Sequence, residues 1–262
     1  MRIQCESRQQ HSNNSCWKKR CTFIAFDKFV RFVLKKKTMG IQQNLRSIQQ
    51  ALPERVTLVA VSKFHPAAAI REAYAAGQRI FGESRVQELM QKREELADLT
   101  DIEWHFIGHL QRNKVKYIAP FVSLIHSVDS PELLREIDRQ GARCGRVIPC
   151  LLELHVAAET TKAGLTPEEC LAMLEEGEWR SLSHVQLCGI MTMATFTDDS
   201  QQVRREFHRA YACYQSARER YFAADPYFTI RSWGMSDDHL LAIQEGSTHV
   251  RIGTDIFGER EY

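Results

Sequence analysis

Residues 57–82 read TLVAVSKFHPAAAIREAYAAGQRIFG, a stretch that contains one complete strand–helix–strand unit. Thr57–Lys63 is short and rich in β-branched and apolar side chains, which is typical of a buried strand. Pro66 opens an alanine-rich helix that ends at Gly77, because proline suits the first turn of a helix and glycine suits its end. Arg79–Gly82 is the next predicted strand.

The same alternation of strand and helix continues along the chain. The remaining predicted strands are Glu103–Ile107, Val122–Val128, Val147–His155, Val185–Thr192, Phe228–Trp233 and His249–Ile252. The remaining predicted helices are Ile41–Leu52, Arg85–Leu99, one near Gln111–Ile118, one after Asp129 or Ser130, one after Thr166, Ser200–Phe222 and Asp237–Glu245. Eight apolar strands alternating with helices in about 220 residues predict an α/β protein, a single (β/α)8 TIM-type barrel.

A doubly wound open sheet is the competing architecture. Such a sheet usually carries a glycine-rich turn directly after its first strand. Neither G-x-G-x-x-G nor G-x-x-x-x-G-K-[ST] occurs in this sequence, which favours the barrel.

The charge distribution divides the chain into two parts. Residues 1–38 contain ten basic and two acidic residues, whereas residues 39–262 contain 25 basic and 31 acidic ones. We expect residues 1–38 to be a basic extension, disordered or loosely helical, and residues 39–262 to form the barrel. An amphipathic helix at a membrane surface is an alternative for the extension, and Met39 is a candidate start of translation. The acidic body gives no reason to expect nucleic-acid binding.

Several classes of protein are excluded by composition. No apolar run approaches the roughly 18 residues that span a bilayer, and no secretory leader is apparent. The eight cysteines form no Cys-x-x-Cys pair and no zinc-finger spacing, which indicates a reducing compartment. We therefore predict a cytoplasmic protein with no disulfide framework, no metal site and no membrane partner, and we expect a monomer.

Lys63 is the first candidate functional residue. Functional groups of such barrels lie at the carboxyl ends of the strands, and Lys63 closes an otherwise uncharged strand. Burial lowers the pKa of an ammonium group, and a partly neutral amine can form a Schiff base with a carbonyl compound. A lysine that merely extends into solvent is the alternative, and position alone leaves both interpretations open.

The run Val250–Gly258 (VRIGTDIFG) is the second candidate. A strand that ends in Gly253-Thr254 presents backbone N–H groups beside a hydroxyl, and barrels often bind phosphate after strands seven and eight. Ser236, in the loop after the seventh strand, offers another donor. The glycines could instead serve tight turns only. Together with Lys63, a phosphate site here suggests a phosphorylated aldehyde as ligand.

Eight motifs spread over the body of the chain identify a family. They are AVSK (60–63), AGQRIFGE (76–83), VQE (86–88), WHFIGHLQRNK (104–114), IHSVDS (125–130), GIMTMA (189–194), GMSDD (234–238) and GSTHVRIGTDIFGER (246–260). With these motifs, residues 41–262 resemble the YggS/PROSC family of pyridoxal phosphate homeostasis proteins. The resemblance implies a fold type III pyridoxal 5′-phosphate (PLP) protein, whose barrel is similar to the N-terminal domain of alanine racemase but lacks its C-terminal β domain.

The resemblance also implies roles for individual residues. Lys63 would be the Schiff-base lysine, and Ser236, Gly253 and Thr254 would hold the phosphate. Arg251 would face the pyridine nitrogen of PLP. A fixed cation there disfavours protonation of the ring and weakens it as an electron sink, which suits a carrier. An ordinary ion pair inside the barrel is the alternative for Arg251.

Two departures from the family pattern lie near the expected cofactor. Ser84 stands where many relatives have asparagine, and it can make one hydrogen bond but with shorter reach. His155 replaces a common asparagine at the end of the fifth strand. Met191, Met193 and Met235 are expected to form pocket wall, with Met235 beside the cofactor.

Other polar residues receive simpler interpretations. His105, His109 and His126 lack the spacing of a helical metal-binding pair, and we expect them to pack or to form hydrogen bonds. Asp237 and Asp238 are expected to cap the following helix rather than to bind a metal.

The family role predicts the function. The chain would hold PLP as a Schiff base on Lys63 within intracellular PLP (vitamin B6) homeostasis, without catalytic residues, and PLP-dependent apoenzymes are candidate partners. The alternative is a PLP-dependent amino-acid racemase, which needs acid and base groups on both faces of the substrate α-carbon. In alanine racemase the second base is a tyrosine of the C-terminal domain, for which we expect no room after Tyr262. A third possibility is an interaction module that works through residues 1–38.

Overall fold

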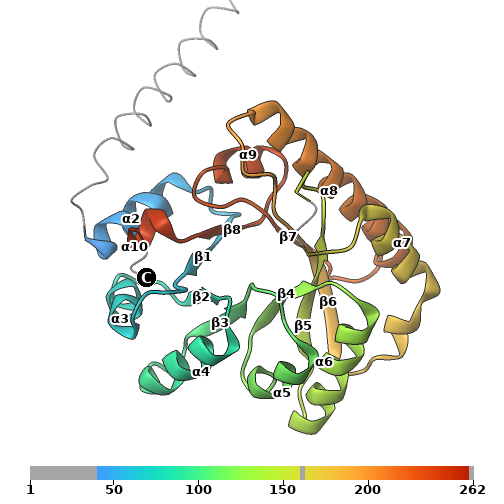
Figure 1. Ribbon diagram of the computed structural model, residues 1–262, viewed down its shortest axis with the longest axis horizontal. Helices are drawn as coiled ribbons and strands as arrows, with labels where there is room; N and C mark the ends of the chain where they lie inside the picture. Colours follow the sequence, from blue (N-terminus) through green and yellow to red (C-terminus); the bar gives the residue numbers. More distant parts are fainter. Residues whose placement is uncertain (1–39, 160–162, 260–262) are drawn as a thin grey trace, which may run out of the picture. The chain divides into compact units, whose positions relative to one another are not determined.

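The strands close into one parallel barrel in the order β1-β2-β3-β4-β5-β6-β7-β8. The computed structural model describes residues 40–159 and 163–259, so the predictions about residues 1–38 lie outside it. The strands are β1 Thr57–Val61, β2 Ile80–Glu83, β3 Glu103–Phe106, β4 Leu124–Val128, β5 Ile148–Leu154, β6 Val185–Thr192, β7 Ile230–Ser232 and β8 His249–Ile252. The predicted (β/α)8 barrel is confirmed (Figure 1).

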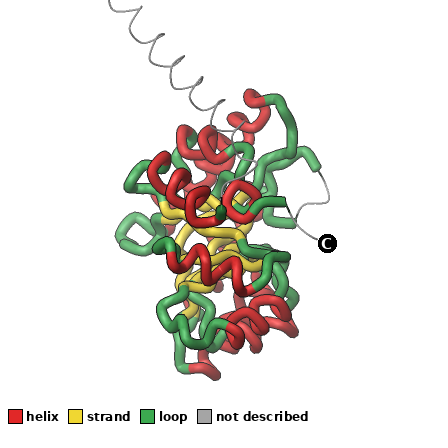
Figure 2. The backbone as a smooth tube through the Cα atoms, turned by 90° about the vertical axis from the view of Figure 1, so that its left-hand side faces the viewer, coloured by secondary structure: helices red, strands yellow, loops and turns green. Residues whose placement is uncertain are grey.

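Helices alternate with the strands along the chain and surround them, as the side view in Figure 2 also shows. They are α2 Ile41–Ala51, α3 Ala67–Ala75, α4 Val86–Glu95, α5 Val115–Ile118, α6 Pro131–Cys144, α7 Pro167–Glu176, α8 Ser200–Tyr221, α9 His239–Gln244 and α10 Thr254–Phe257, with 3-10 turns η1 Arg112–Lys114 and η2 Glu178–Ser181. The short α10 was not predicted from the sequence. None of the helices in the described ranges is long and apolar enough to cross a membrane.

Local sequence signals fix the helix ends. The Ser130 hydroxyl accepts a hydrogen bond from Leu133 N at 3.4 Å, and Gly145 ends α6 in the left-handed conformation. Thr166 and Glu169 form a capping box at the start of α7, with hydrogen bonds of 3.1 and 2.8 Å. Both caps agree with the helix starts that the sequence predicted.

The apolar core has two parts. The larger part lies between the strands and the helices and includes the fully buried Phe81 and Phe106. A separate cluster joins Leu124, Leu151 and Met191. Since successive strand residues point to opposite faces, we place this second cluster inside the barrel. Parallel strands buried on both faces explain why the strand sequences are almost continuously apolar.

Gly189 permits the close approach of β6 and β7. Its φ is +148°, and a Cβ built at this position would lie 1.8 Å from the carbonyl oxygen of Ile230. No side chain fits there, which gives a physical reason for the glycine in the GIMTMA motif.

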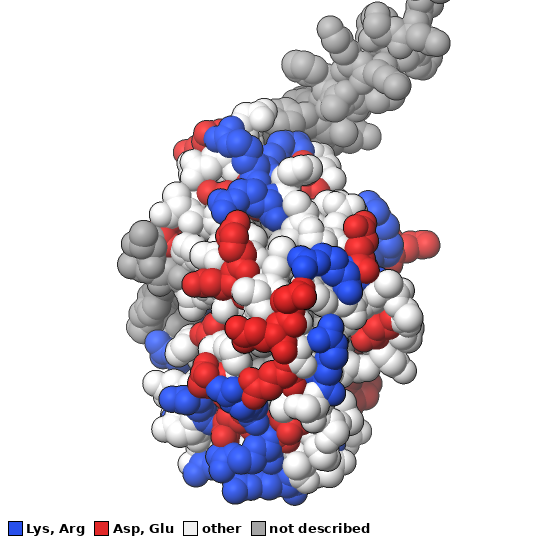
Figure 3. Space-filling view, turned by 90° about the vertical axis from the view of Figure 1, so that its right-hand side faces the viewer, with Lys and Arg blue, Asp and Glu red and all other residues white. Residues whose placement is uncertain are grey.

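Opposite charges are interspersed on the outer face drawn in Figure 3. Two of the ion pairs among the helices are Arg220–Glu175 at 2.7 Å and Arg135–Glu178 at 2.8 Å. All four side chains are exposed, and such pairs contribute little to stability in water.

Candidate functional site

The carboxyl ends of β2, β1, β8 and β7 are neighbours, and they bring the predicted site residues together. In the register, Val61 pairs with Gly82 and Ala60 pairs with Ile252. The predicted residues Ser84, Lys63, Gly253, Thr254, Met235 and Ser236 therefore follow four consecutive strands at one end of the barrel. Lys63, Ser84, Gly253, Met235 and Ser236 are half-buried, and Thr254 is exposed.

The loop after β8 presents backbone N–H groups at the mouth of the barrel. Gly253 directly precedes α10, and its carbonyl accepts hydrogen bonds from Ile256 N and Phe257 N at 2.9 Å. The first N–H groups of a helix have no partner within the helix, so they can bind an anion. A Cβ at Gly253 would lie 3.0 Å from the carbonyl oxygen of Val61 on the neighbouring strand. The backbones after β1 and β8 thus approach closely at the predicted phosphate site.

The loop after β7 is held by Asp238. Met235 N donates a hydrogen bond to Asp238 Oδ1 at 2.6 Å, and His239 Nδ1 lies 3.0 Å from the carbonyl oxygen of Ser236. The prediction that Asp238 caps the next helix needs correction. Asp238 occupies the N-cap position of α9, but its side chain binds the preceding loop and makes no capping hydrogen bond. This arrangement fixes the loop that carries Ser236.

Met235 lines a cavity of about 510 Å³. The cavity also has Ala194, Val203, Asp238 and Leu241 in its wall. It lies beside the loops after β6 and β7, at the same end of the barrel as Lys63.

Arg251 lies inside the barrel beneath these loops. It is 4% exposed, and its Nη1 donates to the carbonyl oxygen and to Oγ of Ser232 at 2.6 and 2.7 Å. Nη2 donates to the carbonyl oxygen of Thr192 at 2.9 Å. Burial lowers the pKa of Arg251 to about 10, although the carboxyls of Asp238 and Glu153 act in the opposite direction. All three hydrogen bonds go to neutral oxygens, which distinguishes Arg251 from an ordinary ion pair.

A buried chain of polar side chains continues from Arg251 across the barrel. Ser232 Oγ is hydrogen-bonded to His126 Nδ1 at 3.0 Å, and His126 Nε2 to His105 Nδ1 at 3.0 Å. Burial lowers the pKa of His105 to about 3 and that of His126 well below the ordinary value, so both imidazoles are neutral at pH 7. The prediction that these histidines form hydrogen bonds is confirmed. The third histidine, His109, is exposed and lies 3.3 Å from Asp129.

No cluster of three or more potential metal ligands occurs within the described ranges.

Glu153 was not singled out by the sequence. It lies on β5, and burial raises the pKa of its carboxyl to about 7. Its Oε2 is buried and makes no hydrogen bond with the described residues. The signal was present in the sequence, since Glu153 is the single acidic side chain in the predicted strand VIPCLLELH.

The two positions that depart from the family pattern have different surroundings. Ser84 lies against the next loop, because a Cβ at Gly108 would lie 2.3 Å from the Ser84 carbonyl oxygen. His155 N donates to the carbonyl oxygen of Leu165 at 2.8 Å, and its Nδ1 is buried without a hydrogen-bond partner among the described residues. Ser84 thus lies beside Lys63 at the barrel mouth, whereas His155 follows β5.

Comparisons with known proteins identify the class of barrel. The family model of the alanine racemase N-terminal domain matches residues 38–261. Alanine racemase of Clostridium difficile has the same fold, with a TM-score of 0.68 at 14% identity over 85% of this chain and 56% of that chain. The fold and site therefore define an alanine racemase N-terminal-type barrel.

Closer relatives identify the family within that class. The pyridoxal phosphate homeostasis proteins of Aquifex aeolicus and Mus musculus are 42% and 36% identical, over 78% and 89% of this chain and 87% and 88% of their own. The structure of PipY from Synechococcus elongatus with PLP bound has a TM-score of 0.76 at 40% identity, and the match covers 84% of this chain and 100% of that one. The chain belongs to the YggS/PROSC family of pyridoxal phosphate homeostasis proteins.

The neutral histidines predict how stability depends on pH. An unfolded chain binds protons at histidine near pH 6.5, whereas folded His105 binds one only near pH 3, so acid favours unfolding. The contribution of His105 is present above pH 6.5 and is lost as pH falls, by about 2 kcal/mol at pH 5. We expect His105→Gln, which keeps a polar group beside His126, to reduce the loss of unfolding free energy between pH 7 and pH 5 by roughly this amount.

Urea unfolding of the apoprotein at several pH values measures this difference. The raised pKa values of Glu83 and Glu153 act in the opposite direction, but they are common to both proteins. His208→Gln is the control, because His208 has a side chain that is 74% exposed. Equal pH dependence of stability in wild type and His105→Gln contradicts the prediction.

Proposed function

We propose that this chain binds PLP covalently through Lys63 and takes part in intracellular PLP homeostasis. The observation that carries the proposal is the adjacency of Lys63, after β1, to the Gly253-Thr254 loop, after β8. An amine and a set of anion-binding N–H groups on neighbouring strands suit a ligand that has an aldehyde and a phosphate on one ring. PipY, solved with PLP bound, supports this at 40% identity.

The donors at the barrel mouth fit a phosphate. The N–H groups of Gly253 and Thr254 and the hydroxyls of Thr254 and Ser236 are neutral hydrogen-bond donors that would hold the dianion. Bound PLP would supply an aldehyde that forms a Schiff base with Lys63 Nζ. Met235, in the wall of the adjoining cavity, would contact the ring. Ser84, beside Lys63, would contribute one hydrogen bond.

Arg251 supports a carrier rather than a catalyst. A guanidinium has five N–H donors and no acceptor, and Ser232 and Thr192 occupy three of the donors. The remaining donors would face the pyridine nitrogen and favour its unprotonated form. A PLP ring in this form is a weaker electron sink, so chemistry at a substrate α-carbon is disfavoured. We therefore propose that the protein has no catalytic residues and hands PLP on.

We propose PLP-dependent apoenzymes as recipients, a monomer as the working form, and the cytoplasm as the location. The described cysteines Cys144, Cys150, Cys170, Cys188 and Cys213 are free thiols, which suits a reducing compartment. Residues 1–38 are proposed to be an extension that PLP binding does not require.

The Schiff base predicts a visible absorbance. Wild type mixed with PLP and passed through gel filtration is expected to absorb at about 420 nm, as protonated imines of PLP do. Lys63→Ala is expected to lack the band, because no amine remains at this position. Lys116→Ala is the matched control, since Lys116 is an exposed lysine of α5. A band that persists in Lys63→Ala, or that wild type fails to show, contradicts the proposal.

The absence of catalysis is tested with amino acids. PLP-loaded wild type, incubated with L-alanine and other L-amino acids, is expected to yield no more D-isomer than Lys63→Ala incubated with PLP or free PLP, as read by chiral chromatography. Formation of D-isomer above the free-PLP level by wild type and its loss in Lys63→Ala would instead support the racemase alternative.

A further inference from the structure

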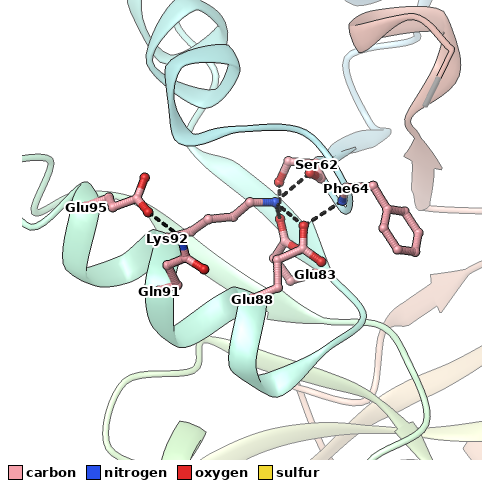
Figure 4. A network of polar contacts seen from close by, with 7 residues as sticks. All are labelled: Ser62, Phe64, Glu83, Glu88, Gln91, Lys92 and Glu95. Atoms are coloured by element: carbon pink, nitrogen blue, oxygen red, sulfur yellow. Dashed lines mark hydrogen bonds and ion pairs between the residues drawn. The ribbon is translucent and has the colours of Figure 1, made fainter. Parts of the chain in front are cut away.

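Lys92 of α4 lies in a buried cluster next to Lys63. It is 4% exposed, and its Nζ donates three hydrogen bonds of 2.7 Å, to the Ser62 carbonyl oxygen, Glu83 Oε1 and Glu88 Oε1 (Figure 4). An ammonium group has three donors, so this cluster uses all of them. Lys92 thus joins the residue that follows β1 to β2 and to its own helix.

The cluster holds the backbone on both sides of Lys63. Ser62, which precedes it, contributes its carbonyl oxygen to Lys92, and the Ser62 hydroxyl donates to Glu83 Oε1 at 2.6 Å. Phe64, which follows it, donates its N–H to Glu88 Oε1 at 2.6 Å. The two residues that flank Lys63 are therefore joined through a single ammonium group.

The backbone at Phe64 needs this support. Its φ is +68°, a backbone conformation that residues other than glycine rarely adopt. Besides Glu88, the guanidinium of Arg85 packs over the Phe64 ring at 4.7 Å. The turn is closed by His65 N, which donates to the Ser62 carbonyl oxygen at 3.1 Å. The chain thus turns sharply directly after Lys63.

Stability alone does not account for such a cluster. Charged groups are costly to bury, and replacing a buried ion pair by apolar side chains is often neutral or stabilising. Here Glu83 is fully buried, and its Oε2 has no hydrogen-bond partner among the described residues. Burial raises the pKa of Glu83 to about 7, and Lys92 opposes the rise. Burial of the Glu83 carboxyl therefore costs free energy. The hydrogen bonds of the cluster hold the backbone on both sides of Lys63.

We propose that Lys92 is a positioning residue that presents Lys63 to the aldehyde of PLP. The inference rests on the proposed function and deepens it, because it separates capture of the aldehyde from docking of the phosphate. Rates of reactions between held groups depend strongly on small displacements. Loss of Lys92 removes no hydrogen bond of the Gly253-Thr254 loop, but it removes the bond that holds the turn at residues 62–64 to α4.

The test compares two ligands on Lys92→Met. PLP reports on imine formation through the band at about 420 nm. Pyridoxine 5′-phosphate has the ring and the phosphate but an alcohol in place of the aldehyde, so it reports on docking without imine formation. We expect Lys92→Met to slow growth of the band by about ten-fold or more. We expect the affinity for pyridoxine 5′-phosphate, measured by calorimetry, to stay within about two-fold, since Lys92 forms its hydrogen bonds with Ser62, Glu83 and Glu88 and with no residue of the Gly253-Thr254 loop.

Matched variants separate positioning from folding. Gln91→Met changes the same helix at an exposed position, where Gln91 Nε2 donates to Glu95 Oε1 at 2.7 Å, and it is expected to behave as wild type (Figure 4). Glu88→Gln retains an oxygen for Phe64 N–H but removes the charge, so an intermediate rate is expected. Glu88→Gln also supplies the test if Lys92→Met does not fold, as judged by circular dichroism.

Each outcome decides between the alternatives. Slow imine formation with unchanged pyridoxine 5′-phosphate affinity supports the positioning role. Equal loss of both ligands overturns it in favour of a merely structural cluster, and an unchanged imine rate overturns it outright. If wild type binds pyridoxine 5′-phosphate but forms no band, the proposed function itself fails, and the inference fails with it.

Discussion

The pairing of β1 with β8 is the interaction on which the rest of the structure depends. It closes the barrel, with Thr57 opposite His249 and Ala60 opposite Ile252. Because the strands are parallel, closure brings the end of the first strand beside the end of the last, although they are almost 200 residues apart in the sequence. Lys63 and the Gly253-Thr254 loop therefore become neighbours only when the whole chain is folded.

The interior of the barrel imposes a second constraint, which concerns charge. Arg251 is a buried cation held by oxygens of Ser232 and Thr192, and beyond it His126 and His105 are neutral. A fixed cation donates hydrogen bonds and disfavours protonation of a nearby basic atom. This site therefore favours a ligand whose facing atom is an unprotonated hydrogen-bond acceptor. The same barrel class includes alanine racemase of Clostridium difficile, so this chain's function depends on its own site residues rather than on the fold.

Local pattern predicted most elements, and interactions between distant residues explain what it missed. The limits of β6 and β8 agree with the strands that the sequence predicted. The predicted strand extended to Lys63, but β1 ends at Val61. The Ser62 carbonyl oxygen accepts a hydrogen bond from Lys92 of α4, and the chain turns there. The helix α10 was missed because four residues show no periodicity. Lys63 was found through its position at a strand end. Glu153 was visible in the sequence as the single acid of an apolar strand, but its burial and its raised pKa depend on residues from other strands.

Covalent binding of PLP to Lys63 is tested directly by locating the bond. Wild type loaded with PLP is treated with borohydride, which reduces an imine to a stable amine, and the digested protein is mapped by mass spectrometry. We expect one phosphopyridoxyl group, on the peptide that contains Lys63, and none on Lys92, whose three hydrogen bonds occupy its ammonium group. A modification spread over surface lysines, or one centred on Lys92, would contradict the account.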